Sequence, residues 1–134
     1  MSLPVTEHQE TKRLVVVSNR LPIVLVKNGD DAWQVEPGSG GLVTALAPIL
    51  RNRGGLWIGW PGTCERISLD KMMEIAAQDT GYSLKPVFLT EEEINRYYYG
   101  FSNEIIWPLF HDLLSRCNFD TTYWEVYQKV NRKF

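Results

Sequence analysis

Two short segments of this chain combine residue types that bind phosphate groups. The run Leu14-Val-Val-Val-Ser-Asn-Arg20 leads from apolar residues to Ser18, Asn19 and Arg20, and Gly38-Ser-Gly-Gly41 follows later. An arginine guanidinium matches phosphate oxygens with two parallel hydrogen bonds. A glycine-rich turn that opens a helix offers unpaired backbone N–H groups to an anion. The two segments together predict a site for two phosphorylated molecules, or for one large one.

The elements around these segments are expected to bring them to one edge of a sheet. Residues 14–20 have the composition of a buried strand, with the polar triplet at its carboxyl end. Residues 21–36 predict a hairpin, because a turn signal at 27–31 separates two arms that can pair. Residues 42–50 carry apolar side chains at helical spacing, and Pro48 is expected to kink that helix. Ligands of open α/β sheets bind at the carboxyl ends of the strands.

The rest of the chain continues the alternation of strands and helices. Further strands are expected over 56–60 and 82–89, and further helices beginning at Ser68, Thr90, Ser102 and Asp120. Thr90-Glu-Glu-Glu93 is a capping-box sequence, which supports the helix start at Thr90. This order predicts an α/β fold with a mostly parallel sheet, a β-hairpin insertion and flanking helices.

Composition and charge restrict the class of protein. The 134 residues and 44% hydrophobic content suit one ordinary soluble domain, which we expect over 13–134, after a polar, disordered tail over 1–12. The net charge of -2 without a basic block gives no support for nucleic acid as a partner. No apolar run is long enough for a membrane span, and the first residues lack the features of a signal peptide. A cytoplasmic location is the expectation.

Several other chemistries find no support in the sequence. Cys64 and Cys117 lack metal-ligand spacing, no metal site is predicted, and no Ser-His-Asp set or P-loop is present. A dinucleotide fingerprint would place its glycines directly after the first strand, so a nicotinamide-dependent reductase is disfavoured. Arg20 could instead be an ordinary surface arginine paired with a carboxylate, but its place directly after the strand favours a role in binding.

Longer motifs give the chain a specific resemblance. They are Arg13-Leu-Val-Val-Val-Ser-Asn-Arg20, Gly40-Gly41-Leu42, Gly55-Leu-Trp-Ile-Gly-Trp60-Pro-Gly62, Tyr98-Tyr-Gly-Phe-Ser-Asn103, Ile106-Trp-Pro-Leu-Phe-His111 and Tyr123-Trp-Glu-Val-Tyr-Gln-Lys-Val-Asn131. In this order they resemble the trehalose-6-phosphate synthases, which are retaining glycosyltransferases of the GT-B fold with two Rossmann-like domains. The resemblance implies that residues 13–134 are the first part of the N-terminal Rossmann-like domain, on the acceptor side.

The resemblance also implies a reaction and an acceptor site. Such enzymes transfer glucose from UDP-glucose to glucose 6-phosphate, giving trehalose 6-phosphate and UDP. By similarity, Arg20 would hold the acceptor phosphate and Tyr98 would donate a hydroxyl hydrogen bond to it. Trp60 and Trp107 would line the acceptor pocket, with Trp107 influencing which anomer is accepted.

The donor site is only partly represented. By similarity, Gly40 and Gly41 would let the backbone approach UDP-glucose, and no metal or further cofactor is implied. The family's second domain supplies the charged residues that grip the diphosphate, so this chain is expected to be a truncated, inactive fragment with no catalytic residue of its own. A homo-oligomer is possible. The alternatives are a related transferase or pseudo-transferase with another sugar-phosphate acceptor, and a non-catalytic subunit that binds sugar phosphate.

Overall fold

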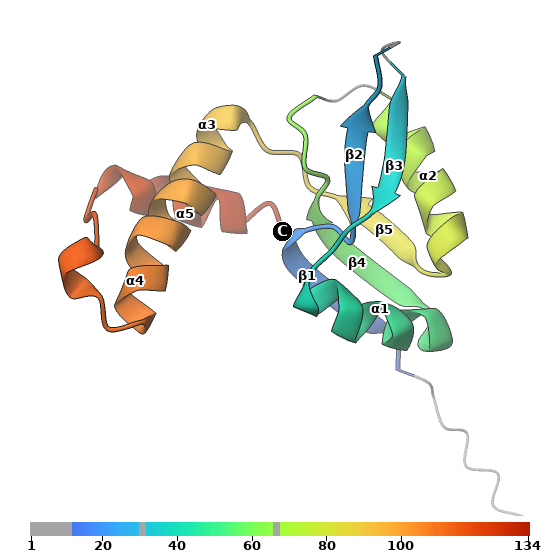
Figure 1. Cartoon of the computed structure of the whole chain (residues 1–134), viewed down its shortest axis with the longest axis horizontal. Helices are drawn as coiled ribbons and strands as arrows, with labels where there is room; N and C mark the ends of the chain where they lie inside the picture. Colours follow the sequence, from blue (N-terminus) through green and yellow to red (C-terminus); the bar gives the residue numbers. More distant parts are fainter. Residues whose placement is uncertain (1–11, 30–31, 66–67) are drawn as a thin grey trace, which may run out of the picture.

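The computed structural model describes residues 12–29, 32–65 and 68–134, so the expected tail over 1–12 lies outside the described residues except for Lys12. The elements, in order, are β1 (Leu14–Arg20), β2 (Ile23–Lys27), β3 (Trp33–Pro37), α1 (Gly41–Arg53), β4 (Gly55–Trp60), α2 (Leu69–Thr80), β5 (Ser83–Pro86), α3 (Glu91–Ile94), the π-helix η1 (Asn95–Ile106), α4 (Trp107–Phe110), the 3₁₀ turn η2 (Leu114–Arg116) and α5 (Thr122–Asn131). Figure 1 shows two parts, a sheet with α1 and α2, and an arm formed by the helices from α3 onward.

The sheet has the predicted parallel topology. Three strands pair in the order β1-β4-β5, with both pairs parallel. The hairpin of β2 and β3 forms a separate antiparallel pair, as expected for an insertion between the first strand and the first helix. Parallel strands are buried by the helices that connect them. The fold therefore confirms the predicted α/β class, with a mostly parallel sheet, a β-hairpin insertion and flanking helices.

The first hydrophobic core joins the sheet to the hairpin, α1 and α2. Its buried side chains are Val16, Leu21, Ile23, Leu25, Ala47, Leu50, Trp57, Met73, Ala76 and Tyr82. Leu50 and Trp57 have no exposed surface at all. Burial of one such side chain contributes about 1.5–3 kcal/mol to folding stability. The cluster therefore stabilises β1 and α1, which carry the two predicted binding segments. The alternate residues Val15 and Val17 of β1 remain half exposed on the opposite face of the sheet.

The arm begins with one continuous helical stretch. It runs from Glu91 through Phe110 and changes from α to π winding at Asn95. The helix start predicted at Ser102 is wrong, because the Ser102 hydroxyl donates to the Tyr97 carbonyl five residues earlier, 3.0 Å away, and lies inside the helix. A second core ties the arm to the end of β4, and its buried members are Trp60, Val87, Leu89, Ile94, Tyr97 and Val130.

Three local expectations differ from the structure. Ser68 precedes α2 but has a left-handed backbone and makes no side-chain capping bond. The strand expected over 82–89 is shorter, since β5 ends at Pro86, although the Val87 N–H still donates to the Gly59 carbonyl at 2.8 Å. Pro48 lies inside α1, and the helix continues past it to Arg53.

Candidate functional site

The carboxyl end of β1 carries an irregularity that sets the direction of Arg20. Val17 pairs with Ile58, and Arg20 pairs with Trp60, so β1 spends one residue more than β4 between these two pairings. Side chains in a regular strand alternate between the two faces of the sheet. The extra residue is a bulge, and a bulge turns the following side chain toward a new direction.

Three contacts hold the bulge in place. The Ser18 hydroxyl donates to the Arg20 carbonyl at 2.6 Å and accepts from the buried indole N–H of Trp57 at 2.8 Å. The Leu21 N–H donates to the Trp60 carbonyl at 3.0 Å. At Gly59 a Cβ would lie 2.8 Å from the Arg20 carbonyl carbon, so only glycine lets β1 approach β4 so closely here.

The Arg20 guanidinium lies over the face of Trp60, with its central carbon 5.1 Å from the ring centroid. Trp60 is buried, and its indole N–H donates to the Thr63 carbonyl at 3.0 Å, which fixes the plane of the ring. Arg20 itself is exposed, and no described carboxylate lies within ion-pair distance of it. The alternative of an ordinary ion-paired surface arginine therefore finds no support in the described part of the chain.

The predicted glycine turn is bound to the segment that follows this arginine. The Gly38 N–H donates to the Pro22 carbonyl at 2.7 Å, which brings the turn to within two residues of the end of β1. Gly40 is the N-cap of α1 and Gly41 its first residue; both are exposed. No side chain caps this helix and its first turn contains no acidic residue. The turn thus leaves backbone N–H groups and the positive end of the helix dipole open to an anion.

The structure places the two other predicted acceptor residues on the arm. Tyr98 is half-buried and packs against the core that contains Trp60. Trp107 is 53% exposed, and its ring stacks on that of His111 at 3.9 Å. Within the described chain no hydrogen bond joins either residue to Arg20. Tyr98 thus packs against the core that contains Trp60, whereas Trp107 lies in the last short helix of the stretch.

The π winding affects how Tyr98 and Trp107 are oriented. They are nine positions apart, and the Trp107 N–H donates to the carbonyl of Ser102, five residues earlier. In an α-helix of about 3.6 residues per turn this separation would place the two side chains on opposite sides. Bonds to the fifth residue back give roughly 4.4 residues per turn, so the separation is close to two whole turns. The winding therefore favours a common side for both aromatic rings.

Two features of the region could not be read from the sequence. Asn19, directly before Arg20, has a buried side-chain oxygen with no hydrogen-bond partner among the described residues. An unpaired buried acceptor costs about 1–3 kcal/mol, so stability alone does not explain this residue in the bulge. A cavity of about 430 Å³ also adjoins the glycine turn. It lies between the hairpin, α1 and the end of α2, and its lining includes Pro22, Gly38, Thr44 and Arg51.

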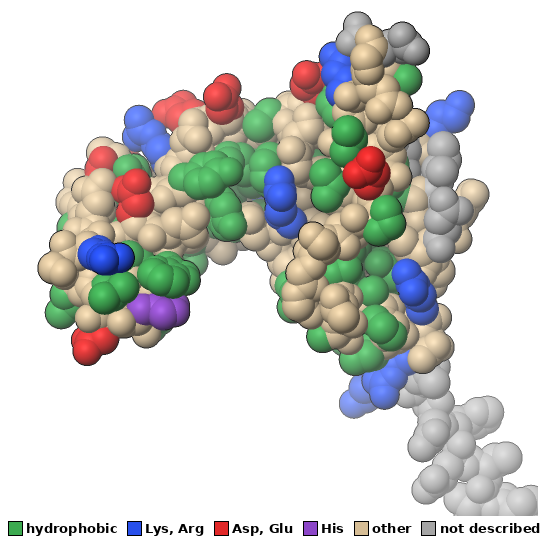
Figure 2. All heavy atoms as spheres, in the orientation of Figure 1, with side chains coloured by type: hydrophobic (Ala, Val, Ile, Leu, Met, Phe, Trp, Pro, Cys, Tyr) green, Lys and Arg blue, Asp and Glu red, His purple; other side chains and the backbone are tan. Residues whose placement is uncertain are grey.

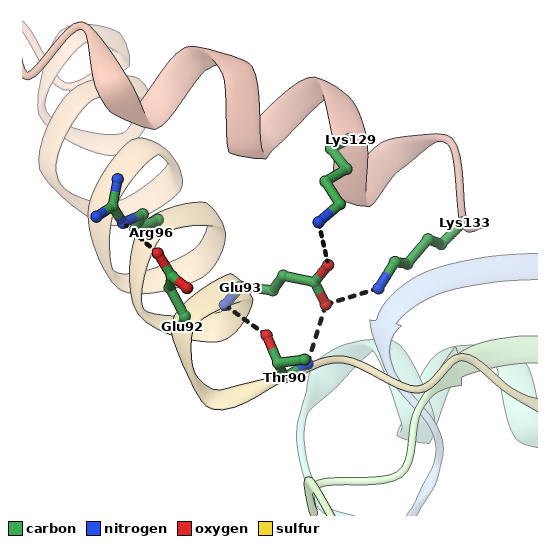
Figure 3. Close-up of polar contacts among 6 residues, drawn as sticks. All are labelled: Thr90, Glu92, Glu93, Arg96, Lys129 and Lys133. Carbon is green, nitrogen blue, oxygen red and sulfur yellow. Dashed lines mark hydrogen bonds and ion pairs between the residues drawn. The ribbon is translucent and has the colours of Figure 1, made fainter.

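A buried carboxylate joins the start of α3 to the end of the chain (Figure 3). Glu93 is 5% exposed; one of its oxygens accepts from the Thr90 N–H at 2.9 Å and from Lys133 Nζ at 2.6 Å. Lys129 Nζ lies 3.4 Å from its other oxygen. Burial alone would raise the pKa of this carboxyl, but the hydrogen bonds and the lysine charges outweigh it and lower the pKa. The sequence predicted the capping box here but not the two lysines.

No group of three or more His, Cys, Asp or Glu side chains among the described residues could hold a metal ion. No helix in the described part combines the length and the apolar character needed to cross a bilayer. Figure 2 shows a broad open hollow between the arm and the sheet part, with hydrophobic side chains and a histidine on the arm's side of it.

Several known proteins are similar to this chain in sequence and fold. The trehalose-6-phosphate synthase of Mycolicibacterium gilvum is 47% identical over 123 residues, which are 90% of this chain and 24% of that protein. An E. coli trehalose-6-phosphate structure bound with UDP-2-fluoro glucose matches with a TM-score of 0.62 and 29% identity, over 90% of this chain and 23% of that one. The chain thus spans about a quarter of the length of these relatives.

A third similarity concerns the acceptor. The UDP-forming α,α-trehalose-phosphate synthase of Burkholderia xenovorans, solved in complex with glucose-6-phosphate, matches with a TM-score of 0.61 and 26% identity. The match covers 90% of this chain and 24% of that one. The model of the Glycosyltransferase family 20 matches residues 12–134, which are nearly all of the sequence. The chain that carries Arg20 on its bulge therefore belongs to glycosyltransferase family 20.

Proposed function

We propose that this chain supplies the glucose 6-phosphate side of a trehalose-6-phosphate synthase. In the whole reaction, glucose passes from UDP-glucose to glucose 6-phosphate, and the products are trehalose 6-phosphate and UDP. The proposal rests on family membership and on the relatives described as bound to glucose-6-phosphate and to a UDP-glucose analogue. The observation that carries it is an exposed Arg20 seated on Trp60, with an uncapped N-terminus of α1 that follows the turn bound to Pro22.

In this proposal each predicted residue has a binding task. Arg20 takes the acceptor phosphate with its guanidinium fork, and Tyr98 adds a hydroxyl hydrogen bond. Trp60 and Trp107 form apolar walls against which a sugar ring can pack. Gly40 and Gly41 present N–H groups to the donor's diphosphate. The chain's contribution to the rate is to orient the acceptor, which can supply a large part of the acceleration.

The bond changes of the proposed transfer need no covalent enzyme intermediate. The anomeric hydroxyl oxygen of glucose 6-phosphate forms a bond to C1 of the donor glucose as the bond from C1 to the diphosphate oxygen breaks. The hydroxyl proton passes to the departing phosphate oxygen on the same face, which retains the configuration. Stabilisation of the charge on that diphosphate is the largest requirement. We propose that the residues of this chain bind the acceptor without turning it over.

Calorimetric titration of glucose 6-phosphate into the chain tests the acceptor site. The wild type and an Arg53→Ala control, which removes an exposed arginine at the far end of α1, are expected to bind saturably. Arg20→Ala is expected to bind at least about tenfold more weakly, since a charge-assisted hydrogen bond contributes about 1.5–3 kcal/mol. Equal affinity of Arg20→Ala and Arg53→Ala would refute the proposed site, and UDP release by the chain alone would refute the proposed lack of turnover.

A further inference from the structure

The turn that follows β4 lies against the end of the Arg20 side chain. Gly62 has a positive φ of 87°, and a Cβ built on it would lie 3.4 Å from Arg20 Nη2 and 4.0 Å from its central carbon. Trp60, two residues earlier, lies under the face of the same guanidinium. One short turn, residues 60–63, therefore contacts Arg20 from two directions.

Each end of this turn is fixed. The Trp60 ring is held by the bond from its indole N–H to the Thr63 carbonyl. The Trp60 carbonyl accepts from Leu21, which ties the turn to the residue after Arg20. The Thr63 hydroxyl accepts from the Glu65 N–H at 3.1 Å. The turn is therefore a preformed support for the guanidinium.

The missing side chain at Gly62 leaves room beside Nη2. An anion oxygen binds a guanidinium nitrogen at about 2.7–2.9 Å, and a carbon atom at 3.4 Å fills the space next to such a position. In the described chain the N–H groups of Gly62 and Thr63 also donate to no other residue. Consecutive free N–H groups in a turn with positive φ form a concavity suited to anions.

We propose that the turn over residues 60–63 is the second half of the phosphate site, with Gly62 as the residue that keeps Arg20 Nη2 open. The Trp60 ring supports the face of the guanidinium, and the space left at Gly62 lets the phosphate bind beside Nη2. A side chain at position 62 covers Nη2 and excludes the phosphate. This inference rests on the proposed function for the identity of the ligand, but the anion contact itself is independent of the sugar.

Matched substitutions separate this role from backbone strain. Gly62→Ala and Gly81→Ala both place alanine at a positive φ, 87° and 77°, but a Cβ at Gly81 would lie 3.9 Å from Arg51 instead of beside Arg20. Both variants are expected to lose similar thermal stability. Should Gly62→Ala fail to fold, the Gly62→Asn and Gly81→Asn pair replaces it, because asparagine tolerates the left-handed region better.

The readout is the NMR signal of the Arg20 Nε–H group during titration with inorganic phosphate and then with glucose 6-phosphate. In the wild type and Gly81→Ala, phosphate is expected to shift this signal saturably; in Gly62→Ala the affinity falls about tenfold or more. Equal phosphate affinity in the two variants, or no response in the wild type, overturns the inference. If phosphate binds as described but glucose 6-phosphate binds no more tightly, the inference stands and the proposed function fails.

Discussion

Lys133 Nζ lies 2.6 Å from a carboxylate oxygen of Glu93, which ties the end of the chain to the first turn of α3. Both groups belong to the part of the arm that packs on the core with Trp60, and the neighbouring Phe134 contacts that core. The packing of the segment after α5 against the start of α3 therefore depends in part on one ion pair.

Loss of this pair is expected to destabilise the protein. Lys133→Met leaves the buried Glu93 carboxylate with fewer partners, so the free energy of unfolding should fall by about 1–3 kcal/mol in urea titrations. Lys129→Met is the matched control, because Lys129 is exposed and farther from Glu93, at 3.4 Å. Its cost should be no more than about 1 kcal/mol. Equal losses of unfolding free energy in the two variants would show that the closer ion pair stabilises the protein no more than the longer one.

The lowered pKa of Glu93 predicts an acid-sensitive contribution to stability. A carboxyl whose pKa is lower in the folded than in the unfolded protein stabilises the fold above its unfolded value of about 4.3. This contribution should disappear as the pH falls through the folded pKa. Glu93→Gln is expected to flatten the dependence of unfolding free energy on pH below about 5. Asp120→Asn is the comparison, since the hydrogen bonds from Thr122 lower the pKa of that exposed carboxyl as well. An unchanged acid slope in Glu93→Gln would contradict this assignment.

Ser18 is expected to link stability to the direction of Arg20. Ser18→Ala removes the acceptor for the indole N–H of the fully buried Trp57, which should cost about 1–3 kcal/mol in chemical unfolding. It also removes the bond to the Arg20 carbonyl, so phosphate affinity should fall along with stability. Ser83→Ala, an exposed serine of β5, is the control. Unchanged phosphate affinity in folded Ser18→Ala would show that the bulge holds Arg20 without this hydroxyl.

The aromatic face of Trp60 is expected to strengthen phosphate binding through its contact with Arg20. Trp60→Phe keeps an aromatic face under Arg20, whereas Trp60→Leu removes it, and both lose the bond to Thr63. Phosphate is expected to bind Trp60→Leu a few-fold more weakly than Trp60→Phe, since an exposed cation–π contact contributes about 0.5–1 kcal/mol. Calorimetry on both variants measures this ratio. Equal affinities would mean that the ring acts only through packing.

Much of the fold was predictable because local signals agreed with it. The apolar runs of β1 and β4, the turn between the hairpin arms and the Thr90 capping box each predicted the element that the structure contains. The helix start at Ser102 was predicted wrongly, since serine favours a helix N-terminus in the absence of a competing bond. Inside η1 its hydroxyl bonds to Tyr97, a partner that only the π winding provides.

The candidate site was predictable in its residue types and less so in its geometry. A strand-end arginine and a glycine turn indicated anion binding, and the Pro22–Gly38 contact brings them together. The seating of Arg20 on Trp60 depends on pairing between distant strands, which periodicity in one segment cannot reveal. The lysines around Glu93 lie in α5 and just after it, some forty residues further on, and left no local signal.

Because of the bulge between Val17 and Arg20, the number of residues in this stretch determines the direction of the arginine side chain. A protein with every one of these residue types but one position fewer in this stretch would regain strict alternation and turn its arginine to the other face of the sheet. Sequence identity would then stay high while the cation left Trp60. For screening or redesign of related proteins, the number of residues from the last regular pairing to the arginine is therefore as informative as the arginine.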